Sequence, residues 1–143
     1  MKKLHVIAQD SALDIKKEKV IAKIDPSIKE SVIFGRFPFT PPSEVIEQML
    51  KTLFEGLREI DPECYILLMT SSRIYDSSMN GDKSPDQLST WLKANFKNTF
   101  YAVRSAGGFK ARGDIDFGFD KNFNDIEQGI ADNILEVYKK IPQ

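Results

Sequence analysis

The chain has 143 residues, of which 41% are hydrophobic and 29% are charged, a composition that fits one folded domain over residues 1–143 and excludes a chain that is disordered throughout. The formal net charge is −1, so no overall basic field attracts nucleic acid or an anionic membrane. No apolar run is long enough to cross a bilayer, and a single cysteine excludes an internal disulfide, so we expect a soluble, cytoplasmic protein.

The first forty residues predict strands. A short apolar run at residues 4–8 is typical of a strand. Residues 13–24 are ambiguous between a strand and a weak helix, and the β-branched residues near the end of this segment favour a strand. Residues 31–39 are aromatic and strand-like, and Pro38 indicates that the end of this strand lies at an edge or leaves the sheet.

The strongest pattern is an amphipathic helix followed by a buried strand. Residues 42–60 carry apolar side chains at i, i+3, i+4 spacing with charged side chains between them, which predicts a helix. Residues 64–70 are a continuous apolar run, which indicates a central strand covered on both faces. We expect these two elements to form the centre of the core.

The second half of the chain predicts two helices around a β-hairpin. After a polar loop at residues 71–84, a capping-box sequence with proline at the first helical position begins a helix that runs to about residue 96. Residues 100–104 and 114–120, with a glycine pair between them, predict the hairpin. Residues 124–141 predict a final amphipathic helix.

The expected order of elements is therefore β-β-β-α-β-α-β-β-α. Helices separate strands only twice, and two hairpins are expected. The predicted fold class is α+β: a single domain with a mixed, mostly antiparallel β-sheet of about 5–6 strands and three amphipathic helices, packed mainly on one face. A fully doubly wound parallel sheet is the alternative.

The last quarter of the chain is acidic. Residues 114–136 carry seven acidic side chains and one basic one, Lys121. Such a region predicts a surface that docks on a basic protein, because opposite charges speed association and select partners. We expect this surface to consist of Asp114, Asp116, Asp120, Asp125, Glu127 and Asp132, together with the loop residues Arg73, Tyr75, Asp76 and Asp82.

An acidic surface without a complete catalytic motif is typical of a non-enzymatic protein-binding module. One concrete form is an immunity or antitoxin protein that neutralises a basic toxin, for example a nuclease. This hypothesis requires no cofactor and no metal, and it predicts a basic protein partner rather than nucleic acid or a membrane.

Asp114 and Asp116 also support an alternative function. Two carboxylates at i and i+2 share one face of a strand and can bind the same divalent cation. With Gly107 and Gly108 before them, they resemble the glycine turn and Asp-hydrophobic-Asp pair of nucleotidyltransferases, which would imply metal-dependent nucleotidyl or phosphoryl transfer. The chain departs from that pattern, since Phe109 stands where a serine is usual and the spacing is shorter.

Three further features predict less. Residues 76–82 carry oxygen side chains at alternate positions, as a calcium loop does, but Lys83 and Gln87 stand where such a loop needs an apolar residue and a bidentate glutamate. His5 is the only histidine, and in its apolar run we expect it to be structural. Cys64 is expected to be a buried, inert thiol, and one histidine makes no histidine-based zinc cluster.

Overall fold

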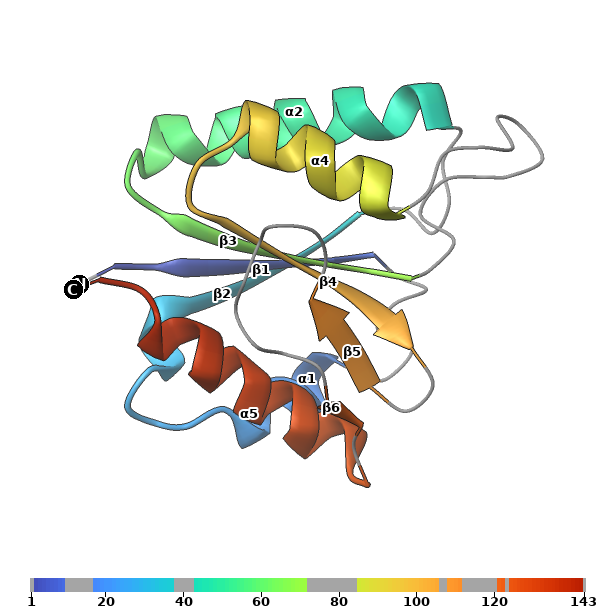
Figure 1. The fold of residues 1–143 in the computed structure, drawn as a ribbon. Helices are drawn as coiled ribbons and strands as arrows, with labels where there is room; N and C mark the ends of the chain where they lie inside the picture. The colour runs from blue at the N-terminus through green and yellow to red at the C-terminus, as the bar shows by residue number, and fades with distance from the viewer. Residues whose placement is uncertain are drawn as a thin grey trace.

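The computed structural model describes residues 2–9, 17–37, 43–71, 85–105, 108–111, 121–122 and 124–142. In this part of the chain a β-sheet lies between two layers of helices (Figure 1). The elements in chain order are β1 (Leu4–Gln9), α1 (Lys17–Lys23), the 3-10 turn η1 (Lys29–Ser31), β2 (Val32–Phe37), α2 (Ser43–Ile60), β3 (Tyr65–Thr70), α4 (Pro85–Asn95), β4 (Thr99–Ser105), β5 (Gly108–Ala111), β6 (Lys121–Asn122) and α5 (Ile126–Lys139).

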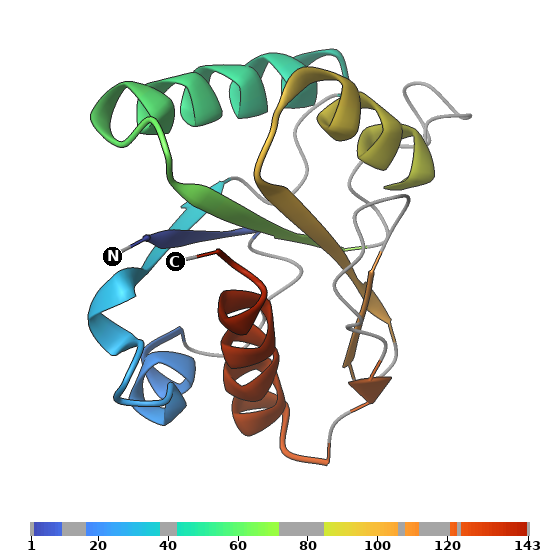
Figure 2. The same cartoon turned by 60° about the vertical axis from the view of Figure 1, so that its left-hand side comes forward.

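The sheet has the strand order β2-β1-β3-β4-β5-β6. β1 pairs in parallel with both β2 and β3, and β3 pairs in parallel with β4. β5 is antiparallel to β4 and to β6. Helices α2 and α4 cover one face of the sheet, and α1 and α5 cover the other, as two views agree (Figures 1 and 2).

The predicted sheet direction and helix arrangement are wrong. A mostly antiparallel sheet with three helices on one face was expected, whereas the first four strands are parallel and the described residues hold four α-helices on both faces. A helix precedes each of the strands β2, β3 and β4, and such a crossover is what a parallel pair requires. The arrangement is nearer to the doubly wound alternative, with an antiparallel edge.

The error begins at α1, which was predicted as part of a strand. Its sequence is KEKVIAK, and only Val20 of its seven residues is buried. The apolar residues that continue this spacing, Ile24 and Ile28, are also buried, so Val20, Ile24 and Ile28 follow an i, i+4 pattern. Reading the segment as a strand removed the crossover between β1 and β2 and left an antiparallel hairpin as the simplest connection.

The hairpin after β4 also differs from the prediction. The strand that pairs with β4 is β5, in the register Val103 to Lys110 and Arg104 to Phe109. The predicted partner, residues 114–120, lies outside the described residues. Strands β1 to β4 and the helices α2, α4 and α5 lie where the sequence predicted them, whereas β6 was not predicted. β2 is at one edge of the sheet that the described residues form.

The core is centred on β1 and β3. All six residues of β1 are buried, and the apolar run of β3 is buried from Ile66 to Met69. Helix α2 packs Ile46, Leu50 and Phe54 against the sheet, each at most 1% exposed. Because full burial of one such side chain contributes about 1.5–3 kcal/mol, these central elements stabilise the positions of residues at both ends of the strands.

Candidate functional site

The structure places only part of the predicted docking surface. Asp125, Glu127 and Asp132 lie at the start and middle of α5. The remaining predicted residues lie outside the described residues, namely Asp114, Asp116, Asp120, Arg73, Tyr75, Asp76 and Asp82. The carboxylate pair of the alternative function and the calcium-like loop therefore stay sequence-based predictions.

Asp125 is the N-cap residue of α5. Its carboxylate accepts a hydrogen bond from the backbone N–H of Gln128 at 3.0 Å and forms an ion pair with Lys23 of α1, also at 3.0 Å. The hydrogen bond from Gln128 and the one from Lys23 hold the pKa of Asp125 below its ordinary value. Asp125 therefore links α5 to α1, and Lys23 offsets part of its charge.

Three acidic residues of α5 form a stripe along the helix. Asp125, Asp132 and Glu136 are spaced by seven and then four residues, which places them on one side of an α-helix. The opposite side is buried through Ile134 and Val137. We call Asp125, Asp132 and Glu136 the acidic stripe. Glu127, which was predicted to belong to the surface, is half-buried, and its position in the helical period is on the side of α5 away from the stripe.

The middle of the acidic stripe is exposed. Asp132 is exposed and accepts a hydrogen bond from the side-chain amide of Gln128 at 2.8 Å, one helical turn earlier. Glu136 is half-buried. No lysine or arginine occurs between Asp125 and Lys139, and Lys139 lies in the last turn of α5, three residues after Glu136.

At the carboxyl ends of the strands, polar side chains join neighbouring strands. Open α/β sheets bind ligands at this edge, where the connections of adjacent strands run to opposite faces. Here Gln9 of β1 is fully buried, and its side-chain oxygen accepts hydrogen bonds from the backbone N–H and the hydroxyl of Ser71 at 2.9 and 3.1 Å. The hydroxyls of Thr70 and Tyr101 lie 2.8 Å apart. These bonds hold the ends of β1, β3 and β4 together.

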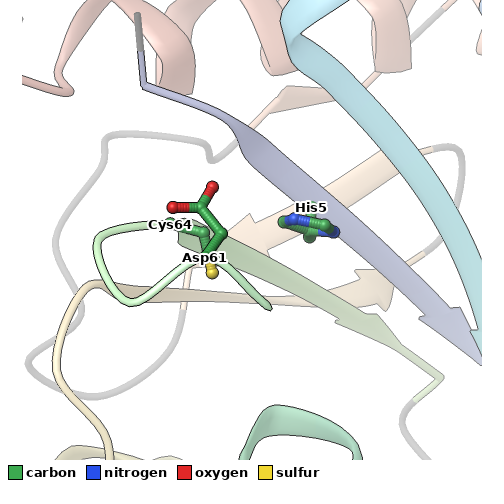
Figure 3. A group of neighbouring side chains, drawn as sticks. All are labelled: His5, Asp61 and Cys64. Carbon is green, nitrogen blue, oxygen red and sulfur yellow. The ribbon is translucent and has the colours of Figure 1, made fainter. Parts of the chain in front are cut away.

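At the amino ends of the strands, the structure brings together three residues that the sequence analysis left apart. One ligand atom from each of His5, Asp61 and Cys64 lies within 4.8 Å of the other two. Figure 3 shows the His5 ring beside Asp61 and Cys64, with a ring nitrogen on their side. We call these three residues the amino-edge cluster.

Local structure explains why the three residues meet. The N–H of Asp61 donates to Leu57 O at 2.8 Å at the end of α2, and the N–H of Cys64 donates to Asp61 O at 3.1 Å, which closes a turn. Pro62 fits the second position of this turn because its φ is fixed. The N–H of Tyr65 then donates to Lys3 O at 2.9 Å, so the parallel pairing of β3 with β1 sets Cys64 beside His5.

The amino-edge cluster is largely buried. Cys64 is 0% and His5 is 9% exposed, while Asp61 is half-buried. Burial lowers the pKa of His5, against the effect of the Asp61 carboxylate, and burial raises the pKa of the Cys64 thiol, against the effect of Arg58. Cys64 is thus buried as expected, but its neighbour is the imidazole that was predicted to be purely structural.

Arg58 of α2 connects the cluster to a pocket on the surface. Its guanidinium donates a hydrogen bond from Nη2 to Lys97 O at 2.6 Å. The positive charge of Arg58 acts to lower the pKa of both His5 and Cys64. The open pocket beside it has a volume of about 460 Å³ and lies between the ends of α2 and α4. Its lining residues are Glu55, Arg58, Glu59, Asn95, Phe96 and Lys97.

Comparisons with known proteins identify no relative. The chain matches no protein-family model, and the searches of curated proteins and of solved structures found no match. Within the described residues, no helix is both long enough and apolar enough to span a membrane.

Proposed function

We propose that this protein is a non-enzymatic binding module that docks on a basic protein through the acidic stripe. The observation that carries the proposal is the position of the stripe: its three carboxylates lie along the side of α5 opposite the buried residues Ile134 and Val137. Charged residues at the rim of an interface mainly raise the association rate and select the partner by charge.

The surroundings of the stripe support this use. Gly129 lies one turn after Asp125 on the same side of α5, and without a side chain it cannot obstruct the carboxylates on either side of it. Lys23 forms an ion pair with Asp125, so an arginine or lysine of the partner competes with Lys23 for the Asp125 carboxylate. Asp132, which is exposed at the middle of the stripe, is then the residue on which docking depends most.

The concrete form that we propose is an immunity or antitoxin protein directed against a basic toxin. Nucleases and other proteins that act on nucleic acids carry basic surfaces, since these surfaces bind the phosphate backbone. An acidic helix side can occupy such a surface and exclude the substrate.

Affinity capture from the source cell tests this proposal. The baits are the wild-type chain, the variant with Asp132→Lys and Glu136→Lys, and a control with Glu55→Lys. Glu55 is exposed on α2, which covers the other face of the sheet. The substitution Glu55→Lys therefore makes the net charge more positive but leaves the acidic stripe unchanged. We expect a basic protein that the wild type and the control retain and the stripe variant loses. A partner that all three baits retain equally would contradict the proposal.

A further inference from the structure

The geometry points to a metal site that is separate from the acidic stripe: we propose that His5, Asp61 and Cys64 together bind one zinc-like transition-metal ion. The donor set is one imidazole nitrogen, one carboxylate oxygen and one thiol sulfur. Thiolate and imidazole ligands favour zinc and related metals, whereas calcium and magnesium take oxygen ligands. The donor set therefore indicates the class of metal.

The distances suit such an ion after small side-chain movements. Zinc lies about 2.0–2.3 Å from nitrogen, oxygen and sulfur ligands, so two ligand atoms of a tetrahedral site lie roughly 3.3–3.8 Å apart. The three donors here lie within 4.8 Å of one another. Asp61 is half-buried at the end of α2, so its carboxylate has room to close the remaining distance.

The scaffold around the donors is already fixed. His5 belongs to the fully buried strand β1, and Cys64 immediately precedes β3, the other central strand. The turn from Asp61 to Cys64 is closed by a backbone hydrogen bond of 3.1 Å. Binding therefore orders few groups, and positioned ligands of this kind are what a metal site on rigid elements requires.

The charges balance when the ion binds. The Cys64 thiol loses its proton to solvent on binding, so the thiolate and the Asp61 carboxylate together carry two negative charges against the two positive charges of the ion. The site lies at the carbonyl end of α2, where the helix dipole favours a cation. These two effects offset the repulsion from Lys3 and Arg58, the two cations that act on His5.

Arg58 provides a second, independent observation. Its Nε atom is buried and has no hydrogen-bond partner among the residues that the structure describes. The same guanidinium lies beside the Cys64 thiol. A metal-bound thiolate accepts hydrogen bonds from neighbouring donors, so metal binding gives the buried Arg58 donor a partner. Three protein ligands also leave one coordination position for water.

Titration of the reduced, chelator-treated full chain with Co²⁺ tests the site. We expect one equivalent to bind, with the near-ultraviolet charge-transfer absorption of a cobalt–thiolate bond, and we expect Zn²⁺ to displace it. Cys64→Ser should abolish this absorption. Asp61→Asn should weaken Co²⁺ binding roughly 10–100-fold, and His5→Gln should weaken it similarly. Glu18→Gln on α1 is the control, because Glu18 is exposed and belongs to neither site, and this variant should bind Co²⁺ as the wild type does.

Asp61→Asn keeps the test decisive if Cys64→Ser fails to fold, because Asp61 is half-buried and its substitution leaves the core intact. Circular dichroism of each variant checks its fold, and Zn²⁺ should raise the Tm of the wild type more than that of Asp61→Asn. A wild-type chain that binds Co²⁺ without the charge-transfer absorption would overturn the proposal. So would an affinity that is the same in Asp61→Asn and in the wild type.

Discussion

The side-chain nitrogen of Lys23 lies 3.0 Å from a carboxylate oxygen of Asp125, and this ion pair joins two helices that are 102 residues apart in the sequence. The side chains are 38% and 55% exposed, so solvent screens the pair and its contribution to stability is small. The same carboxylate caps α5 through the N–H of Gln128. Asp125 therefore stabilises the fold mainly as a helix cap.

Substitutions at Asp125 separate the cap from the ion pair. Asp125→Ala should lower the midpoint of urea unfolding, because it removes both interactions. Asp125→Asn should retain most of the stability, since asparagine caps helices about as well as aspartate does. Lys23→Ala should change the midpoint little. If Asn and Ala at position 125 lower the midpoint equally, the ion pair and not the cap is the main interaction.

The buried hydroxyl pair of Thr70 and Tyr101 should behave as one unit. Tyr101→Phe leaves the Thr70 hydroxyl without this partner and should lower the free energy of unfolding by about 1–2 kcal/mol. Thr70→Val should cost a similar amount. The double variant should cost less than the sum of the two, because each single substitution already removes the hydrogen bond that the two hydroxyls share. Strict additivity in urea unfolding would show that the two hydroxyls do not interact.

Substitution by alanine should change the stability of the protein in opposite directions at two glycines, Gly35 and Gly56. A Cβ atom at Gly35 of β2 would meet the Ile7 Cδ1 atom at 3.0 Å, whereas a Cβ at Gly56 of α2 meets nothing within 4 Å. Gly35→Ala should therefore destabilise the protein by about 1 kcal/mol through crowding. Gly56→Ala should stabilise it by about 0.5–1 kcal/mol, since alanine favours a helix interior. Thermal unfolding of the two variants side by side provides the comparison, and a shift of the same sign in both would contradict it.

Asp25 should titrate below its ordinary pKa. The Ser27 hydroxyl and backbone N–H donate to its carboxylate at 2.6 and 2.9 Å, and these bonds, the hydroxyl first, lower the pKa of Asp25. The folded pKa is below the unfolded value of about 3.9, so the stability from these bonds is present above that value and is lost as pH falls through the folded pKa. Ser27→Ala should raise the pKa of Asp25 measured by NMR. An unchanged pKa in that variant would exclude the hydroxyl as the main cause.

The elements that the sequence predicted correctly are those with a strong local pattern. Helix α2 carries an apolar stripe over 18 residues, and β3 is a continuous apolar run, so each pattern is stronger than any competing one. Helix α1 has seven residues and one buried side chain. So short a segment shows too little helical spacing of apolar residues to outweigh the β propensity of its β-branched residues. That single error reversed the predicted direction of the sheet.

The amino-edge cluster could not be predicted in the same way, because its members lie far apart in the sequence. His5 and Cys64 meet only through the parallel register of β1 and β3. The one local signal was the sequence Asp61-Pro62-Glu63-Cys64, which predicts a turn with a carboxylate and a thiol at its ends. In contrast, the sequence analysis placed Asp125 and Asp132 in the predicted docking surface, but it included Glu127 and left out Glu136, because it followed the acidic composition of the segment rather than the helical period.

The association rate with the captured partner, measured by stopped flow against ionic strength, tests docking through the acidic stripe most directly. We predict that the wild-type rate constant falls steeply as salt is added and that Asp132→Lys with Glu136→Lys lowers it at least about tenfold at low salt. Glu55→Lys on α2 should match the wild type within about twofold. Equal rates for the stripe variant and the Glu55→Lys control, or a wild-type rate that does not depend on salt, would contradict docking through this side of α5.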